Sequence, residues 1–201
     1  MRYLALGDSY TIGEGVAAEE RWPVRLAVLL RAEGLAIDEP EILARTGWTA
    51  NELLAALDAA PPLGLYDLVT LLVGVNDQYR GAPVDAYRVA FRALAERAVA
   101  LAASAPGRLV VLSIPDWGAT PFADGRDRGR IAGEIDRFNE INRDETTRLG
   151  GRYVDVTAAS RRPGRPGGPS LVAEDGLHPS GIVHDEWARL ALPQARAAVR
   201  G

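Results

Sequence analysis

Short apolar runs alternate along this chain with longer segments in which apolar residues recur at helical spacing. The apolar runs have the length of buried strands and occupy residues 3–6, 41–44, 68–73, 109–114 and 153–156. Five strands that alternate with helices favour a parallel sheet covered on both faces. With right-handed crossovers, the pattern predicts an α/β fold, a three-layer α/β/α sandwich on a mainly parallel five-stranded sheet.

The segments between the strands carry signals that begin and end helices. Pro23 near the start and Gly34 at the end frame one helix. Thr49 and Glu52 have the spacing of a capping box at the start of the next helix. Gly150 ends a later helix that carries Ile131, Ile135, Phe138 and Ile141 on one face.

The C-terminal segment predicts a last helix that starts near Ser180 and carries Val183, Trp187 and Leu190. Pro193 is expected to bend or end this helix. His184 is expected on its exposed face. The Pro-, Gly- and Arg-rich stretch of residues 161–169 predicts a surface loop.

Length and composition indicate one globular domain over residues 1–201. The net charge is −4 and every basic residue is a scattered Arg, which argues against a nucleic-acid partner. The chain has no Cys, which excludes disulfides, thiolate metal sites and a Cys nucleophile. The apolar runs are too short for membrane insertion. Because the first strand starts at Tyr3, no signal peptide is visible, and we expect a cytoplasmic protein.

Small and polar residues follow each strand, where an open α/β sheet places its functional site. The turns are Gly7-Asp8-Ser9, Arg45-Thr46-Gly47, Gly74-Val75-Asn76-Asp77, Pro115-Asp116-Trp117-Gly118 and a long final loop with Asp175 and His178. Several of these turns supply groups that acyl transfer requires.

Ser9 is the candidate nucleophile, and a serine needs a neighbouring base at neutral pH. With two His residues in the chain, His178 is the candidate base. Asp175, three residues earlier, would orient the imidazole, although Asp116 and Asp155 also lie near strand ends and compete for this role. Taken alone, Ser9 could instead be a helix N-cap.

An oxyanion intermediate needs hydrogen-bond donors that are already in place. The candidates are the backbone N–H groups of Ser9 and Gly47 and the side-chain amide of Asn76. Trp48, Tyr79 and Trp117 flank the same turns, as packing residues or as walls of an acyl pocket. Asp175, His178, His184 and Asp185 make a poor metal site, and we expect neither a metal nor another cofactor.

Taken together, the turns resemble the motif blocks of the SGNH (GDSL-type) hydrolase family. The blocks match Gly7-Asp8-Ser9, Gly47, Gly74 with Asn76 and Asp77, and Asp175 with His178 and Pro179, in the order of the family. Tyr10 stands where the family name has Leu. The resemblance implies a flavodoxin-like SGNH fold, a catalytic triad of Ser9, Asp175 and His178, and an oxyanion hole of Ser9, Gly47 and Asn76.

The resemblance also implies a GDSL-type esterase or lipase that cleaves small-molecule carboxylic esters, or thioesters, of short acyl chains through an acyl-enzyme. A carbohydrate O-acetyl esterase and a non-catalytic binding module on the same fold are the alternatives. The sequence does not determine the natural substrate, its acyl-chain length or the oligomeric state.

Overall fold

The computed structural model describes residues 1–60, 64–164 and 167–201. Its centre is a parallel sheet with the strand order β2-β1-β3-β4-β5. The strands are β1 (Tyr3–Gly7), β2 (Glu41–Ala44), β3 (Leu68–Leu72), β4 (Leu109–Leu112) and β5 (Arg152–Val154). The strand order reverses between β1 and β3, and ligands of open α/β sheets bind beyond the carboxyl ends of strands at such a reversal.

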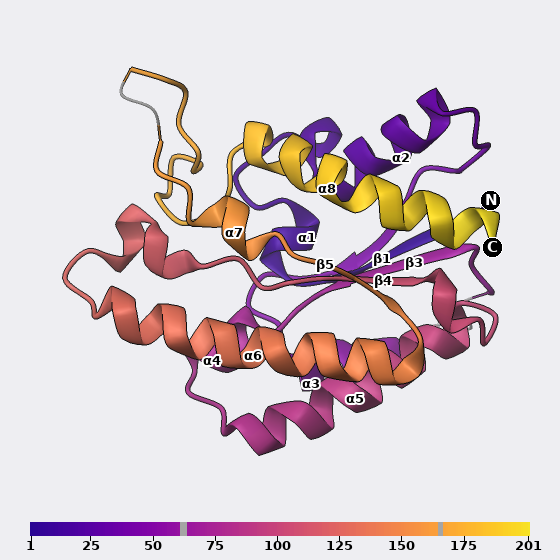
Figure 1. Cartoon of the computed structure of the whole chain (residues 1–201), viewed down its shortest axis with the longest axis horizontal. Helices are drawn as coiled ribbons and strands as arrows, with labels where there is room; N and C mark the ends of the chain where they lie inside the picture. The colour runs from indigo at the N-terminus through magenta and orange to yellow at the C-terminus, as the bar shows by residue number, and fades with distance from the viewer. Residues whose placement is uncertain (61–63, 165–166) are drawn as a thin grey trace.

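Helices cover both faces of the sheet, so the predicted three-layer α/β/α sandwich is confirmed (Figure 1). The long helices α2 and α8 lie on one face, and α3, α5 and α6 lie on the other (Figure 1). The helices are α1 (Ser9–Ile12), α2 (Trp22–Ala32), α3 (Ala50–Ala59), α4 (Val75–Tyr79), α5 (Val84–Leu101), α6 (Arg128–Leu149), α7 (Thr157–Ser160) and α8 (Gly181–Arg200). Short 3-10 turns occupy Ala18–Glu20, Pro106–Arg108, Trp117–Ala119 and Pro121–Ala123.

The three inner strands are buried along their whole length, which explains their continuous apolar runs. β2 and β5 form the edges and are only partly buried. The register is regular: Leu4 of β1 pairs with Glu41 on one side and with Val69 on the other. The carboxyl ends of all five strands therefore point to one edge of the sheet.

The predicted helix signals act as expected. The backbone N–H of Thr49 donates to Glu52 Oε2 at 2.8 Å, and the Glu52 N–H donates back to Thr49 Oγ1, which completes the capping box of α3. Gly150 ends α6 in the left-handed conformation, with φ of 81°.

β4 ends earlier than its apolar pattern predicts. The side chain of Asn139 on α6 accepts from the Ile114 N–H at 2.7 Å and donates to the Ile114 carbonyl at 3.0 Å. These bonds take both backbone groups of Ile114, so the strand does not continue through this residue.

Pro193 does not end α8, which continues to Arg200. A proline inside a helix costs about 3 kcal/mol. Buried residues on both sides of Pro193 offset this cost because they hold both halves of α8 against the fold: Trp187, Ala188 and Ala191 before it, and Ala195 and Ala198 after it.

The expectation that His184 is exposed is wrong, because its side chain is fully buried. His184 Nδ1 accepts from the Trp22 N–H at 3.1 Å, which joins α8 to the start of α2. Burial, together with the charges of His178 and Arg21, lowers the pKa of His184 to about 4, so His184 is neutral at neutral pH.

The segment predicted as a surface loop contains no helix after α7 in its described parts, 161–164 and 167–169, which are exposed; residues 165–166 lie outside the described residues. No helix in the described residues is long and apolar enough to cross a membrane.

Candidate active site

Ser9 lies at the carboxyl end of the central strand β1, as the first residue of α1. Asp8 caps this helix: its Oδ1 accepts from the Tyr10 N–H at 3.0 Å. Ser9 is therefore not the N-cap. A Cβ atom on Gly7 would lie 2.4 Å from the Leu72 carbonyl oxygen, so only glycine lets the chain turn this closely beside β3.

Asp8 is fully buried beneath this turn, and its Oδ2 has no partner among the described residues. Burial raises the pKa of Asp8 to about 8; the hydrogen bond from Tyr10 opposes this rise, and the nearby charge of Asp77 contributes to it. Asp8 is thus largely protonated at neutral pH and acts as an uncharged cap.

The candidate base and acid come from one short turn before α8. His178 Nδ1 lies 2.5 Å from Asp175 Oδ2. Asp175 Oδ1 also accepts from the backbone N–H groups of Leu177 and His178, both at 2.9 Å. Burial alone would raise the pKa of Asp175, but these hydrogen bonds, led by the one from His178, hold it below its ordinary value. The acid is therefore ionised and fixes the ring of its neighbour.

The two competing acids are engaged elsewhere. Asp116 pairs with Arg161 at 2.8 Å and accepts from the Gly118 N–H at 2.8 Å. Asp155 accepts from the Thr157 N–H at 2.8 Å. Neither is hydrogen-bonded to His178, so of the three acids only Asp175 is placed to orient it.

Asn76 is the second residue of α4, at the carboxyl end of β3. Gly74 makes the turn before it with φ of 124°, and a Cβ there would also lie 2.9 Å from the Ile114 side chain. Asn76 Nδ2 donates one hydrogen to the Trp48 carbonyl at 3.0 Å, so its amide is fixed and retains a second N–H.

Gly47 lies in the turn between β2 and α3. Its φ of 85° is in the left-handed region that favours glycine. The Gly47 carbonyl accepts from Arg80 Nη2 at 2.6 Å, which ties the turn to the residue after α4. The two turns that hold the candidate oxyanion donors are thus joined to each other.

A cavity of about 190 Å³ brings these residues together. It is lined by Ser9, Tyr10, Thr46, Gly47, Val75, Asn76, Tyr79, Trp117, Phe122, Leu177 and His178. We call it the catalytic cavity. Every proposed site residue except Asp175 lines it, and Asp175 reaches it through the His178 ring.

Three aromatic rings form one wall of the catalytic cavity. The centroid of Tyr79 lies 5.3 Å from that of Trp117 and 6.3 Å from that of Phe122. Trp117 Nε1 donates to Gln78 Oε1 at 2.8 Å, which fixes the central ring. Trp48 does not line the cavity and packs against the core.

Sequence reasoning singled out Tyr79 and Trp117 but missed Phe122 and Leu177 as cavity residues. Phe122 follows Pro121 in the loop after β4. An apolar aromatic residue among turn residues at a strand end was the available signal. Leu177 gave a weaker signal, since it is a single aliphatic residue between Asp175 and His178, the two polar residues that define the motif.

Within the described residues, no group of three or more His, Cys, Asp or Glu converges as a metal site would require. His184 Nδ1 is already occupied by the Trp22 N–H. The arrangement of groups suits acyl transfer.

The parallel α/β sandwich, with its polar residues gathered beyond the central strands, has the fold of the SGNH hydrolases. The sequence profile of the GDSL-like lipase/acylhydrolase family matches residues 5–185. The chain belongs to this family.

Solved structures with the same fold cover nearly the whole chain. TesA has a TM-score of 0.74 and 20% sequence identity, over 98% of this chain and 99% of TesA. A lipase/acylhydrolase from Enterococcus faecalis has a TM-score of 0.70 and 20% identity, over 98% and 96%. A catalytic mutant of Axe2, an acetylxylan esterase from Geobacillus stearothermophilus, has a TM-score of 0.74 and 19% identity, over 96% and 93%. A search by sequence among curated proteins gives no match.

Proposed function

We propose that this protein hydrolyses carboxylic esters of short acyl chains through an acyl-enzyme on Ser9. The observation that best supports this proposal is the shared lining of one cavity by Ser9, Gly47, Asn76 and His178, with Asp175 at 2.5 Å from the far nitrogen of His178. A cavity of this size and a chain of negative net charge favour small-molecule esters over a polyanionic partner.

In the first step, Ser9 Oγ attacks the ester carbonyl carbon while His178 Nε2 takes its proton. The tetrahedral intermediate then collapses: the bond to the alcohol oxygen breaks, and that oxygen takes the proton from His178. Water repeats the sequence on the acyl-enzyme, which releases the carboxylic acid and restores Ser9. A thioester would follow the same steps with sulfur as the leaving atom.

Asp175 stabilises the imidazolium that forms in each step, and its carboxylate accepts the hydrogen bond from Nδ1–H, which keeps Nε2 free to act as the base. The oxyanion would accept from the N–H groups of Ser9 and Gly47 and from the second amide hydrogen of Asn76. The amide of Asn76 is already fixed by the Trp48 carbonyl, so little reorganisation opposes its role.

The size of the catalytic cavity supports short acyl chains. Its 190 Å³ is below the range of roughly 300–1,000 Å³ typical of pockets for drug-sized ligands. The aromatic wall of Tyr79, Trp117 and Phe122 closes one side of the cavity.

A carbohydrate O-acetyl esterase is the second candidate. Tyr79 and Phe122 are 47% and 39% exposed, and exposed aromatic faces beside a cavity are suitable stacking surfaces for a sugar ring. Acetylxylan esterases are also among the similar structures.

The test is turnover of p-nitrophenyl acetate, butyrate, octanoate and dodecanoate by the wild type, Ser9→Ala and the exposed control Thr147→Ala. We expect the short esters to be cleaved fastest, Ser9→Ala to be inactive, and Thr147→Ala to match the wild type. A fluorophosphonate should add its mass to the peptide that contains Ser9. Equal turnover by Ser9→Ala would refute the nucleophile, and no turnover of any ester with no labelling would favour a binding module.

A further inference from the structure

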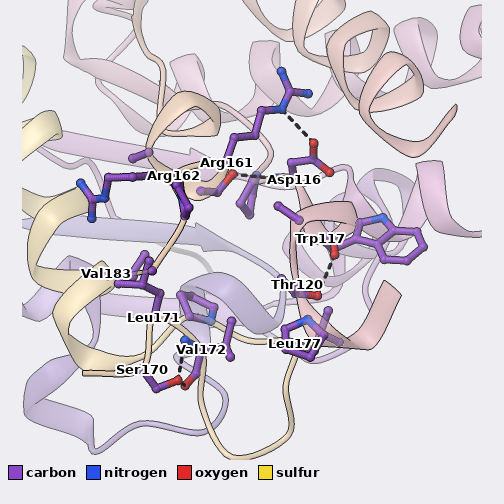
Figure 2. A pocket seen from close by; sticks show the side chains of 18 of the residues that line it. Asp116, Trp117, Thr120, Arg161, Arg162, Ser170, Leu171, Val172, Leu177 and Val183 are labelled. Carbon is purple, nitrogen blue, oxygen red and sulfur yellow. Dashed lines mark hydrogen bonds and ion pairs between the residues drawn. The ribbon is translucent and has the colours of Figure 1, made fainter. Parts of the chain in front are cut away.

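A second, larger cavity of about 600 Å³ adjoins the catalytic cavity. Figure 2 shows it between the loop after β4, the segment 170–172 and the first turn of α8. Tyr10, Trp117 and Leu177 line both cavities, so these three side chains form the wall between them. We call it the side cavity.

The side cavity adjoins the turn that carries the candidate base, His178. Leu177 and Pro179, which flank His178 in the sequence, both line it. Residues 170–172 form the outer wall of this cavity, and two backbone hydrogen bonds hold this wall against the same turn. The Ala173 N–H donates to the His178 carbonyl at 2.7 Å, and the Ser180 N–H donates to the Leu171 carbonyl at 3.1 Å.

The candidate oxyanion donors are on the other side of the site. Gly47 and Asn76 line the catalytic cavity and do not line the side cavity. In the proposed reaction the carbonyl oxygen points to these donors, and the alcohol oxygen must lie beside His178 to receive its proton. The side cavity therefore borders the position of the leaving alcohol.

Most polar side chains around the side cavity already have partners, although the buried Trp187 Nε1 has none among the described residues. Arg161 Nε donates to Asp116 Oδ2 at 2.8 Å, and Arg162 Nη1 donates to Glu186 Oε1 at 2.6 Å. Thr120 Oγ1 donates to the Trp117 carbonyl at 2.7 Å, as Figure 2 shows. A polyol would have to compete with these bonds.

The remaining lining is largely apolar. It includes the aliphatic side chains of Leu171, Val172 and Val183 and the ring of Trp187. It also includes the prolines Pro115, Pro121, Pro163, Pro169 and Pro179. Because proline fixes its φ angle, these five positions lose little backbone freedom when a ligand binds.

We propose that the side cavity binds an apolar alkyl or aryl group of the leaving alcohol, while the catalytic cavity holds the small acyl group. This inference rests on the proposed ester hydrolysis and names its substrate class: short-chain acyl esters of bulky apolar alcohols.

Two ester series test the assignment by direct titration of the released acid. In the first, the acyl group is constant and the alcohol grows: ethyl, butyl, hexyl and 2-phenylethyl acetate. In the second, the alcohol is constant and the acyl group grows: ethyl acetate, butyrate and hexanoate. We expect kcat/KM to rise at least tenfold from ethyl to hexyl acetate and to fall from ethyl acetate to ethyl hexanoate.

Two variants fill the side cavity from different elements, Val183→Phe on α8 and Leu171→Trp in the outer wall. Val89→Phe, at a site on α5 that is 68% exposed, is the matched control. We expect either filling variant that keeps the wild-type circular dichroism spectrum to lower the ratio of kcat/KM for hexyl acetate to kcat/KM for ethyl acetate about tenfold. Val89→Phe should keep the wild-type ratio.

The outcomes separate this inference from the proposed function. Ester turnover with no preference for larger alcohols, or a preference in the acyl series instead, overturns the side-cavity assignment alone. Faster turnover of glucose pentaacetate than of hexyl acetate, reduced by Val183→Phe, overturns the apolar character of the group. No turnover of any ester and no labelling of Ser9 refutes the proposed function itself.

Discussion

Asp175 and His178 are joined twice, by the 2.5 Å contact between Oδ2 and Nδ1 and by the His178 backbone N–H that donates to Oδ1 at 2.9 Å. The acid therefore fixes both the ring and the backbone of the candidate base. Since the two residues are three apart, one turn delivers both groups to the edge of the sheet.

Asp175→Asn should keep the fold and lower kcat/KM on p-nitrophenyl acetate by about two to four orders of magnitude, because an amide cannot stabilise the imidazolium. Initial rates at pH 7.5 measure the effect. Asp155→Asn is the matched control and should stay within a few-fold of wild type. A larger loss in Asp155→Asn than in Asp175→Asn would transfer the role of the acid to Asp155.

Asn76→Ala should lower kcat about a hundredfold or more and leave KM within a few-fold, since a lost oxyanion donor costs on the order of 3 kcal/mol in the transition state only. Steady-state kinetics on the same ester separate the two constants. Asn51→Ala, at an exposed position on α3, should behave as the wild type. An effect confined to KM would contradict the oxyanion role.

Glu145→Gln should destabilise the fold by roughly 2–4 kcal/mol, because it removes the charge that holds three arginines. Glu145 on α6 is buried and pairs with Arg88 and Arg92 of α5 and with Arg148, all at 2.8 to 2.9 Å. Urea unfolding at pH 7 measures the loss. Glu140→Gln, exposed on the same helix, should change stability little.

The same cluster predicts a pH dependence. The hydrogen bond from Arg92, and then those from Arg148 and Arg88, lower the pKa of Glu145 to about 2, below the ordinary value of 4.5. Because the folded-state pKa is depressed, the contribution is fully present above pH 4.5 and is lost as the pH falls toward 2. The difference in stability between wild type and Glu145→Gln should therefore shrink over this range. A stability difference between the two proteins that stays constant from pH 7 to pH 3 would contradict the lowered pKa of Glu145.

His184→Asn should make the protein less sensitive to mild acid. The pKa of His184 is about 4 in the folded chain and 6.5 ordinarily, so the unfolded chain binds the extra proton as the pH falls through 6.5. Between pH 6.5 and 4 this costs the wild type up to about 3 kcal/mol of stability. Asn can still accept from the Trp22 N–H and does not titrate. Urea unfolding at pH 7.5 and 5 should show a smaller decrease for the variant, and equal decreases would refute the assignment.

The sequence determined the elements whose signals are local or continuous. β1, β3 and β4 are buried on both faces. Strands of that kind are apolar at nearly every position, so each can be recognised in the sequence as a continuous apolar run. The capping box of Thr49 and Glu52 acts within four residues and needs no tertiary contact to be recognised. The motif blocks likewise identified the family, because each block lies inside one turn.

Only the tertiary structure decided features that depend on a distant partner. His184 is buried because α8 packs on α2 and offers the ring to Trp22, 162 residues away. β4 stops where Asn139 takes its backbone groups, and α8 passes Pro193 because both of its halves are packed. The two cavities are of the same kind: their walls come from segments far apart in the chain, and no local pattern encodes the space that side chains leave between them.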